Sequence, residues 1–429
     1  MLPLASRPLR ASTVRARLGR AGVAAALALV AGAGLAWAIV GPTGPPRRPP
    51  VRLPPGMGSP LVAVDRLHGG HFVLASTGVP VELRGFDYQP LVKVPGHARR
   101  YVNVTFSPGH YRHGHVAAIT RRWEAEGYDA VRVFLNPTEI GSPSGPGLDP
   151  AYLANLADLV TTAAVHRVRT IVTVGSLPTH GGFTPRGRRD FGLYNQDYLD
   201  PAFLAAEQRY LTALVDGLRA EEAPLADILW ELKGEQDWNL AAAPLDWRSG
   251  TVRTANGGRY DMASPTARAA MERANLANWA NRLAGVLHRL VRGSLVGVGV
   301  YSPSVRRHRW AVSPGPLFSS ATGIDFVDVH VYPNLGPEAA QMAGFHAEAT
   351  HKPVIMGEFG ATRAAPVQVA SAALVTWQEQ SCHLGGLSVS GWLLWTWDSS
   401  ADPQFWDAQA HGGEIAHALS PATRPDPCG

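Results

Sequence analysis

Hydrophobic residues along the chain gather in short continuous runs, and longer stretches with helical spacing separate these runs. Most of the runs are rich in valine, isoleucine and leucine and show no polar alternation. This pattern is typical of parallel strands that are buried on both faces. We therefore predict eight strands, at Val81–Tyr88, Ala130–Leu135, Thr170–Val174, Ile228–Leu232, Leu295–Tyr301, Phe326–Tyr332, Pro353–Glu358 and Gly391–Trp397.

The stretches between the runs carry recognisable helix starts. Asp149-Pro150, Asp200-Pro201 and Ser264-Pro265 each place a capping side chain before a proline at the first helical position. Eight strands that alternate with helices predict a (β/α)8 barrel. A doubly wound open sheet is the alternative fold, but no glycine-rich phosphate loop follows the first strand.

The positions of the long insertions favour the barrel and indicate where its site lies. Each long polar or aromatic insertion follows a strand and precedes a helix, and in a barrel such loops form the face at the carboxyl ends of the strands. Enzymes with this fold build their sites there, so we expect functional residues at the strand ends. The insertions are residues 89–113, 175–199, 236–263 and 302–323.

Residues 1–41 have the pattern of an export signal. Five arginines up to Arg20 precede an uncharged run from Ala21 to Val40, and about twenty helical residues span the ~30 Å of bilayer hydrocarbon. Arginines before the run place the amino terminus in the cytoplasm and the remainder outside. Ala36-Trp37-Ala38 also offers a cleavage site, so signal peptide and signal anchor both stay open. We expect an extracellular protein, secreted or tethered to the membrane through this segment alone.

Composition divides the rest of the chain. Residues 42–60 are rich in proline and predict a semi-rigid linker, which leaves residues 61–429 for the predicted barrel domain. Residues 1–53 hold eight of the 39 basic residues and none of the 34 acidic ones, so the body is slightly acidic and we expect no nucleic-acid partner. Cys382 and Cys428 could pair outside the cell, although spacing alone does not show it.

Two glutamates follow the fourth and seventh predicted strands. Glu235 and Glu358 each come just after an apolar run, where carboxylates are seldom buried unless they are paired. Cleavage of a glycosidic bond needs such a pair, one carboxyl as a protonated acid and the other as an ionised nucleophile or stabiliser. Like charges about 5 Å apart raise one pKa, so the environment can divide the roles. The alternative interpretation is two unrelated glutamates in salt bridges.

Six segments resemble strands of glycoside hydrolase clan A, and most closely those of the cellulases and β-mannanases of family 5. The likeness runs in the same order over about residues 80–400, and strands six and seven are its most specific parts. The segments are Leu83–Phe86, Val131–Val133, Ala226–Glu235, Phe326–Pro333, Pro353–Gly360 and Gly391–Trp395, for strands one, two, four, six, seven and eight.

The resemblance implies a mechanism and a set of site residues. Members of the family are retaining enzymes, so Glu235 would be the acid/base and Glu358 the nucleophile. Arg132 would lie beside the nucleophile, and His330 and Tyr332 would be the family's histidine and tyrosine. No cofactor and no metal are implied. We expect hydrolysis of the O-glycosidic bonds of a β-linked polysaccharide or oligosaccharide, of glucan or mannan type.

One departure from the family pattern concerns the residue before the acid/base. The family has an asparagine there that holds the substrate 2-hydroxyl, whereas this chain has Gly234, and Gln236 replaces the usual proline after the glutamate. Loss of one preorganised donor commonly costs ~10²–10³ in rate. Lys233, Gln236 and Asn239 are candidate substitutes. The departure also keeps a second interpretation open, a non-catalytic carbohydrate-binding barrel at the cell surface.

Aromatic residues and histidines supply the remaining candidates. We expect Trp395 to form a floor under a sugar ring, with core packing as the alternative. Trp238, on a predicted rim loop together with Trp247 and Trp406, is expected to line a saccharide groove. His110, His113 and His115 are spaced like metal ligands and suggest a metal-dependent hydrolase as a third interpretation. Because no matching set recurs at another strand end, we favour solvated loop histidines.

Overall fold

The computed structural model describes residues 53, 58–67, 70–96, 101–186, 190–235, 238–301, 315–320, 322–332, 336–346, 352–382, 389–398 and 404–428. The predicted export segment and most of the predicted linker lie outside these residues, so both stay predictions. Pro49–Gly429 is one compact unit. In the described part of the chain, no helix combines the length and the apolar character that a membrane crossing requires.

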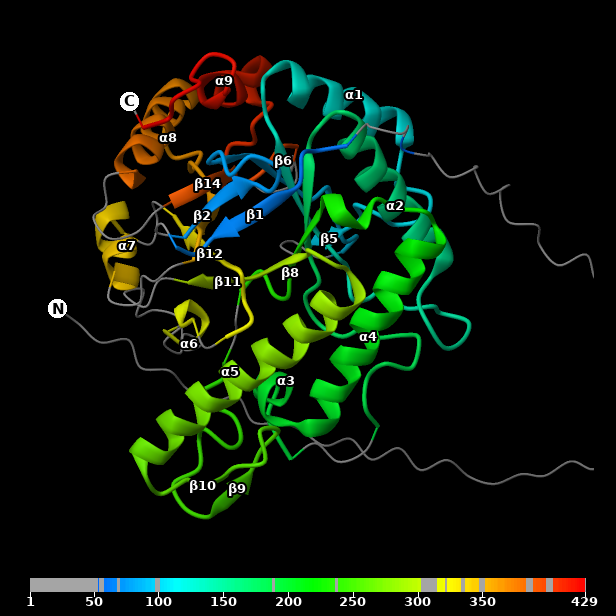
Figure 1. Cartoon of the computed structure of the whole chain (residues 1–429), viewed down its shortest axis with the longest axis vertical. Coiled ribbons are helices and arrows are strands. Elements are labelled where there is room, and N and C mark those ends of the chain that lie inside the picture. The colour runs from blue at the N-terminus through cyan, green and yellow to red at the C-terminus, as the bar shows by residue number, and fades with distance from the viewer. Residues whose placement is uncertain are drawn as a thin grey trace, which may run out of the picture. The chain divides into compact units, whose positions relative to one another are not determined.

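Eight parallel strands close into a barrel, which confirms the predicted (β/α)8 fold and excludes the open sheet (Figure 1). Every barrel strand overlaps one of the predicted runs, because each run is apolar enough to be buried on both faces. In order around the barrel the strands are β3 (Leu83–Tyr88), β6 (Ala130–Phe134), β7 (Arg169–Thr173), β8 (Ile228–Glu231), β11 (Leu295–Tyr301), β12 (Phe326–Val331), β13 (Val354–Phe359) and β14 (Val389–Leu394).

Helices cover the outside of the barrel (Figure 1). The three predicted starts are confirmed, because the side chains of Asp149, Asp200 and Ser264 accept hydrogen bonds from the first-turn N–H groups of their helices. The helices of this layer are α1 (His113–Ala125), α2 (Pro150–Val165), α4 (Pro201–Ala220), α5 (Pro265–Leu290), α6 (Gly315–Phe318), α7 (Glu338–His346), α8 (Val367–Ser381) and α9 (Ala410–Leu419), and the short 3-10 helix η1 (Leu225–Asp227) precedes β8.

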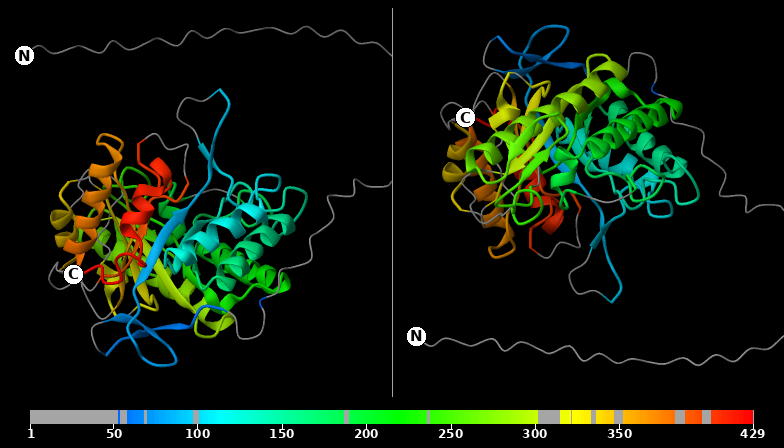
Figure 2. Two further views of the ribbon diagram at one scale, coloured as in Figure 1. Left: turned by 90° about the horizontal axis from the view of Figure 1, so that it is seen from above. Right: turned by 90° about the horizontal axis from the view of Figure 1, so that it is seen from below.

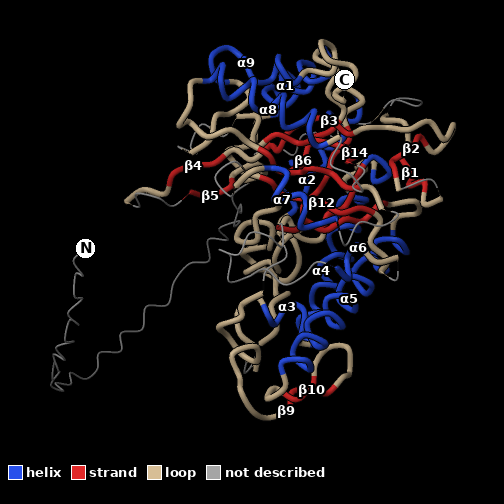
Figure 3. The backbone as a smooth tube through the Cα atoms, turned by 90° about the vertical axis from the view of Figure 1, so that its left-hand side faces the viewer, coloured by secondary structure: helices blue, strands red, loops and turns tan. Residues whose placement is uncertain are grey.

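Short antiparallel hairpins occur outside the barrel wall, and the hydrophobic pattern did not predict them. The hairpin of β1 (Val62–Asp65) and β2 (His71–Leu74) lies at the amino-terminal end of the barrel, and the hairpin of β4 (Leu91–Lys93) and β5 (Tyr101–Asn103) projects from the other end (Figures 2 and 3). The insertion after β7 contains α3 (Asn195–Leu199), and the insertion after β8 contains β9 (Thr251–Arg253) and β10 (Arg259–Asp261). Strands of three or four residues give too short a pattern to detect.

The inside of the barrel changes from apolar to charged along its axis. Near the amino ends, a closed apolar cluster fills the interior, and Phe72 of β2 packs edge-on against Phe326. The next inward positions carry Asp87, Arg132 and Asp328, all fully buried. The site residues follow at the carboxyl ends of the strands. The apolar cluster consists of Phe72, Leu83, Ala130, Ile171, Leu229, Phe326, Ile355 and Leu393.

A disulfide ties the carboxyl-terminal tail to the helix layer. Cys382, which follows α8, is bonded to Cys428, and their Cα atoms are 5.6 Å apart. The same segment is held by Arg424, which donates hydrogen bonds to Gln378 and Glu379. This is the pairing that the sequence left open.

Candidate active site

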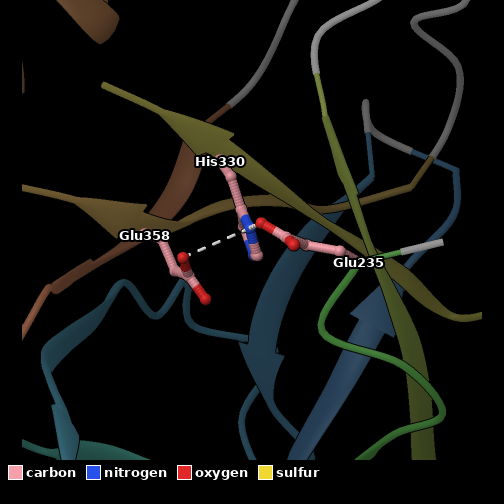
Figure 4. Close-up of side chains that lie close together, drawn as sticks. All are labelled: Glu235, His330 and Glu358. Carbon is pink, nitrogen blue, oxygen red and sulfur yellow. Dashed lines mark hydrogen bonds and ion pairs between the residues drawn. The ribbon is translucent and has the colours of Figure 1, made fainter. Parts of the chain in front are cut away.

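The two predicted glutamates converge at the carboxyl-terminal mouth of the barrel (Figure 4). Glu235 comes four residues after the end of β8, and Glu358 lies in β13. One carboxylate oxygen of each, together with a ring nitrogen of His330, lie within 4.8 Å of one another. The spatial expectation drawn from the sequence is therefore met, and two isolated rim glutamates are excluded.

A local irregularity of β13 turns Glu358 into the barrel. Ile355 faces the interior, so strict alternation would place Gly357 inside and Glu358 outside. The register against β12 shifts between Val329 and His330, and His330 then pairs with Glu358. A Cβ at Gly357 would lie 1.9 Å from Asp328 Oδ1, which is why a glycine is needed at this shift.

His330 and Tyr332 bind the two carboxylates directly. His330 Nδ1 lies 3.0 Å from Glu235 Oε1 and 3.4 Å from Glu358 Oε2. The Tyr332 hydroxyl donates to the same Glu358 oxygen at 2.6 Å. Glu235 keeps 30% of its side chain exposed, whereas Glu358 keeps 9%. The structure thus gives one partly open carboxyl and one enclosed carboxylate, an asymmetry suited to two different roles.

Arg132, which lies deeper in the barrel, binds the carboxylate of Glu358. Its Nη1 lies 2.9 Å from Glu358 Oε1, and its Nη2 lies 3.4 Å from His330 Nε2. The guanidinium stacks on Phe134, with its carbon 4.5 Å from the ring centroid. Arg132, His330 and Tyr332 are therefore brought together with the glutamates, as the sequence predicted.

Burial and opposing charges set the protonation of these groups. Burial raises the pKa of Glu358, while His330, Arg132 and the Tyr332 hydrogen bond act to lower it. Burial acts to lower the pKa of His330, but the carboxylates of Glu358 and Asp328 outweigh it, so the pKa is raised well above its usual range. A cationic imidazole between the two glutamates therefore stabilises negative charge at the mouth.

Three further acids lie beneath the mouth, and the sequence analysis missed them. Asp87, Glu231 and Asp328 are fully buried and surround Arg132. Arg132 Nε lies 2.8 Å from Glu231 Oε2, and Thr173 also donates to that oxygen. The inward alternation of β3, β8 and β12 was the available signal for these positions.

Gly234 is partly exposed and packs against Arg132. A Cβ at this position would lie 2.9 Å from Arg132 Nη2, so an asparagine side chain does not fit while Arg132 keeps its place. Two proposed substitutes are also engaged elsewhere. Lys233 Nζ is buried and lies 2.5 Å from Asp197 Oδ2, and Asn239 Oδ1 accepts from a backbone N–H in its own turn. The Lys233 suggestion was wrong, the Asn239 suggestion stays a prediction because its amide nitrogen is not tested, and Gln236 lies outside the described residues.

We expect the change Gly234→Asn to lower turnover instead of restoring the family pattern. The added side chain would push Arg132 away from Glu358, and the loss of one preorganised charge contact is on the order of 10²-fold in rate. Gly234→Ala is the matched control, with a smaller loss, since it adds a single methyl group. The measurement is kcat on a hydrolysed glycan, with the Tm of each variant. An increase in kcat with Gly234→Asn would contradict this prediction.

The two predicted tryptophans have different surroundings. Trp395 follows β14 at the mouth, is half-buried, and meets Phe134 edge-on at 5.8 Å between ring centroids, which is compatible with a sugar-binding role. Trp238 has 0% exposure and stacks on Tyr198, so it packs in the core and does not line a groove. The expectation for Trp238 was wrong because its loop folds back onto α3. Of the other rim tryptophans, Trp247 is exposed, and Trp406 donates to a backbone carbonyl.

The loop histidines do not form a metal site with one another. His113 lies 2.9 Å from Asp158, and His115 lies 3.1 Å from Asp398, on a different part of the surface. Among the described residues, the three side chains of ligand type that lie close together are Glu235, His330 and Glu358, and His330 contacts both glutamates.

No protein-family model matches the sequence, and neither does any curated protein. Solved structures do match the fold. They include an endo-1,4-β-mannanase from Rhizomucor miehei (TM-score 0.57, 15% identity, 85% of this chain and 100% of that one). An exo-β-1,4-mannosidase from an Opitutaceae bacterium matches with TM-score 0.52 and 16% identity over 83% of this chain, which spans 58% of that longer enzyme. A GH5_18 protein from Streptomyces cattleya in complex with Manβ1-4GlcNAc matches with TM-score 0.52 and 17% identity, over 80% of each chain. The barrel is thus similar in fold to the family 5 enzymes that the sequence motifs resemble.

Proposed function

We propose that this chain is a retaining glycoside hydrolase in which Glu358 is the nucleophile and Glu235 the acid/base. The observation that carries the proposal is the separation of the two carboxylates, whose nearest oxygens lie within 4.8 Å. Retaining glycosidases keep their carboxyl groups about 5–5.5 Å apart, whereas inverting enzymes leave about 6.5–9.5 Å for a water molecule.

The environment of each carboxylate supports its role. Glu358 receives Arg132 on one oxygen and Tyr332 on the other, which favours the ionised form and aims it into the mouth. Glu235 is the more exposed of the two and accepts one contact from His330. It can therefore protonate a departing oxygen and later deprotonate an incoming water.

For the substrate, we propose a β-linked glycan of mannan type, with glucan as the alternative. The support is the similarity in fold to proteins described as β-mannanases and a β-mannosidase, and to one solved in complex with Manβ1-4GlcNAc. Trp395 beside Phe134 would supply the apolar floor on which a sugar ring packs.

A panel of glycans tests this proposal. The full chain is incubated with β-mannan, β-glucan and manno-oligosaccharides, and products are identified by mass and by the anomeric configuration of the released sugar. We expect release from a β-mannoside with retained configuration. Inverted configuration would contradict the mechanism, and hydrolysis of glucan alone would contradict the substrate.

We also expect hydrolysis to be unaffected by a chelator, because the proposed chemistry uses two carboxylates and no metal. The measurement is kcat on the best substrate before and after incubation with EDTA and gel filtration. A loss that added divalent metal restores would favour the metal-dependent hydrolase instead.

The second candidate function is a sugar-binding barrel without catalysis, which Gly234 in place of the family asparagine favours. Isothermal titration with oligosaccharides beside the product assay separates the two, since binding without product supports this candidate. The close, well-supported carboxylate pair favours the enzyme, because binding alone does not require two converging acids.

We propose that the protein acts outside the cell. The supporting observations are the arginine-then-apolar pattern of residues 1–41 and the disulfide between Cys382 and Cys428, since disulfides persist in oxidising compartments. Fractionation of cells that express the full chain tests this location.

A further inference from the structure

If every acid and base around Arg132 carried its usual charge, the negative charges would outnumber the positive ones. Four buried acids contact its guanidinium, one each from β3, β8, β12 and β13. Among the described residues, the cations within 4.0 Å of these acids are Arg132 and His330. Two positive charges would then face four negative ones, three of them on carboxyls with no exposed surface. Burying unbalanced charge is costly, so some of these carboxyls should carry a proton. The four acids are Asp87, Glu231, Asp328 and Glu358.

The geometry indicates Glu231 as one of the proton carriers. Its Oε2 already accepts from Arg132 Nε at 2.8 Å and from Thr173. Asp328 Oδ2 lies 3.4 Å from the same Nε, and a single N–H does not serve two carboxylates well. Within the described residues, Glu231 Oε1 and both Asp328 oxygens are buried without a hydrogen-bond partner. A proton on Glu231 would supply the missing donor.

The electrostatics agree with this assignment. Burial raises the pKa of Glu231 to about 8, with Asp328 adding to the rise and Arg132 opposing it. The pKa of Asp328 is lowered, because Arg132 and His330 together outweigh its burial. The charged groups on the surrounding strands are Asp87 (β3), Arg132 (β6), Asp328 and His330 (β12) and Glu358 (β13). The two strands that pair with β8 place Thr173 (β7) and Gly297 (β11) beside Glu231, and neither residue titrates.

We propose that Glu231 is a positioning residue that works as a neutral carboxylic acid, accepting from Arg132 with one oxygen and donating to Asp328 with the other. Arg132 thereby keeps its charge directed at Glu358, 2.9 Å from Nη1. An ionised Glu231 would compete with Glu358 for the same guanidinium. This inference rests on the proposed role of Glu358 as nucleophile.

Substitution by glutamine tests the protonation state through activity. In Glu231→Gln the amide reproduces both hydrogen bonds of the neutral acid, so kcat at about pH 6 should stay within about threefold of wild type. Glu231→Ala should lose about 10²-fold. An activated aryl β-glycoside serves as substrate, because its departure needs no proton from Glu235. Above about pH 8 the wild type should lose activity. At about pH 9, Glu231→Gln should retain a fraction of its kcat at about pH 6 that is roughly tenfold larger than the fraction retained by the wild type.

A stability measurement tests the same proton without any activity. Because the pKa of Glu231 is raised by folding, its contribution to stability is complete below about pH 4.5 and is lost as the pH rises through about 8. The wild-type Tm should therefore fall by several degrees relative to that of Glu231→Gln between about pH 5 and about pH 8.5. For the activity test above, Glu272→Gln on α5 is the matched control, since burial raises its pKa to about 7 away from Arg132. It should leave the activity profile unchanged.

The outcomes separate this inference from the proposed function. A Glu231→Gln variant as inactive as Glu231→Ala, or one that loses activity above pH 8 as the wild type does, would show that the carboxylate form is the working one and would overturn the inference. Parallel Tm curves for wild type and Glu231→Gln would overturn it as well. If the full chain hydrolyses no glycoside, the proposed function fails, and the Tm comparison still decides whether Glu231 is neutral.

Discussion

Replacing Glu358 by glutamine is expected to reduce turnover by at least about 10⁴-fold while leaving the fold intact. An amide cannot attack the anomeric carbon, and losses on removal of a covalent-catalysis nucleophile are on the order of 10⁴–10⁶. The glutamine oxygen can still accept from Arg132 Nη1, and its NH₂ group can face the Tyr332 hydroxyl. The substitution therefore keeps the Arg132 contact and reverses the hydrogen bond with Tyr332, but it loses the ion pair with His330. The measurement is kcat by release of reducing ends, with Tm as the test of folding.

Chemical rescue distinguishes a lost nucleophile from a damaged site. In Glu358→Ala, azide can enter the vacated space and attack an activated β-glycoside, giving an α-glycosyl azide of inverted configuration. Glu379→Gln on α8, a carboxylate paired with Arg424 at the surface, is the control and should keep wild-type turnover. If Glu358→Gln retains about a tenth of the wild-type kcat, Glu358 is not the nucleophile.

The hydrophobic pattern was sufficient for the barrel because each strand is buried on both faces and reads as a continuous apolar run. It also indicated Glu235 and Glu358, since residues that end parallel strands meet at one face of a barrel. Arg132, His330 and Tyr332 came instead from the resemblance to the family 5 strands.

Features that depend on side-chain packing were not accessible in the same way. Strict alternation would point Glu358 away from the mouth, and only the register shift at Gly357, where Asp328 leaves no room for a Cβ, turns it inward. Trp238 looked like a rim residue because its loop is long, but Tyr198 covers it. Gly234 looked like a missing side chain, whereas the structure places a guanidinium nitrogen 2.9 Å from where its Cβ would lie.

The buried acids explain how a site with this departure can remain ordered. Arg132 is fixed by contacts from four strands, so its position does not depend on an asparagine at residue 234. The same contacts bring negative charge close to the nucleophile, which a protonated Glu231 would offset. The buried acids around Arg132 thus explain why the site tolerates a glycine at residue 234.

Replacing Glu235 by glutamine is expected to reduce turnover by an amount that depends on the leaving group. For an oligosaccharide, the departing sugar oxygen is a poor leaving group and needs the proton, so kcat should fall about 10³- to 10⁴-fold. For an activated aryl glycoside, the first step needs no acid, and the loss should be far smaller. His330 Nδ1 lies 3.0 Å from Glu235 Oε1 and can still contact the amide oxygen, so the site should stay in place. The measurement is kcat on both substrates.

Azide and pH complete the test of Glu235, because each separates an acid/base from a nucleophile. With Glu235→Ala and an activated glycoside, azide should replace the deprotonated water and release a β-glycosyl azide of retained configuration, opposite to the product expected from Glu358→Ala. The alkaline loss of oligosaccharide hydrolysis that depends on the Glu235 proton should also disappear. Equal losses on both substrates, with no azide product, would show that Glu235 only binds the sugar and that the proton comes from another group at the mouth.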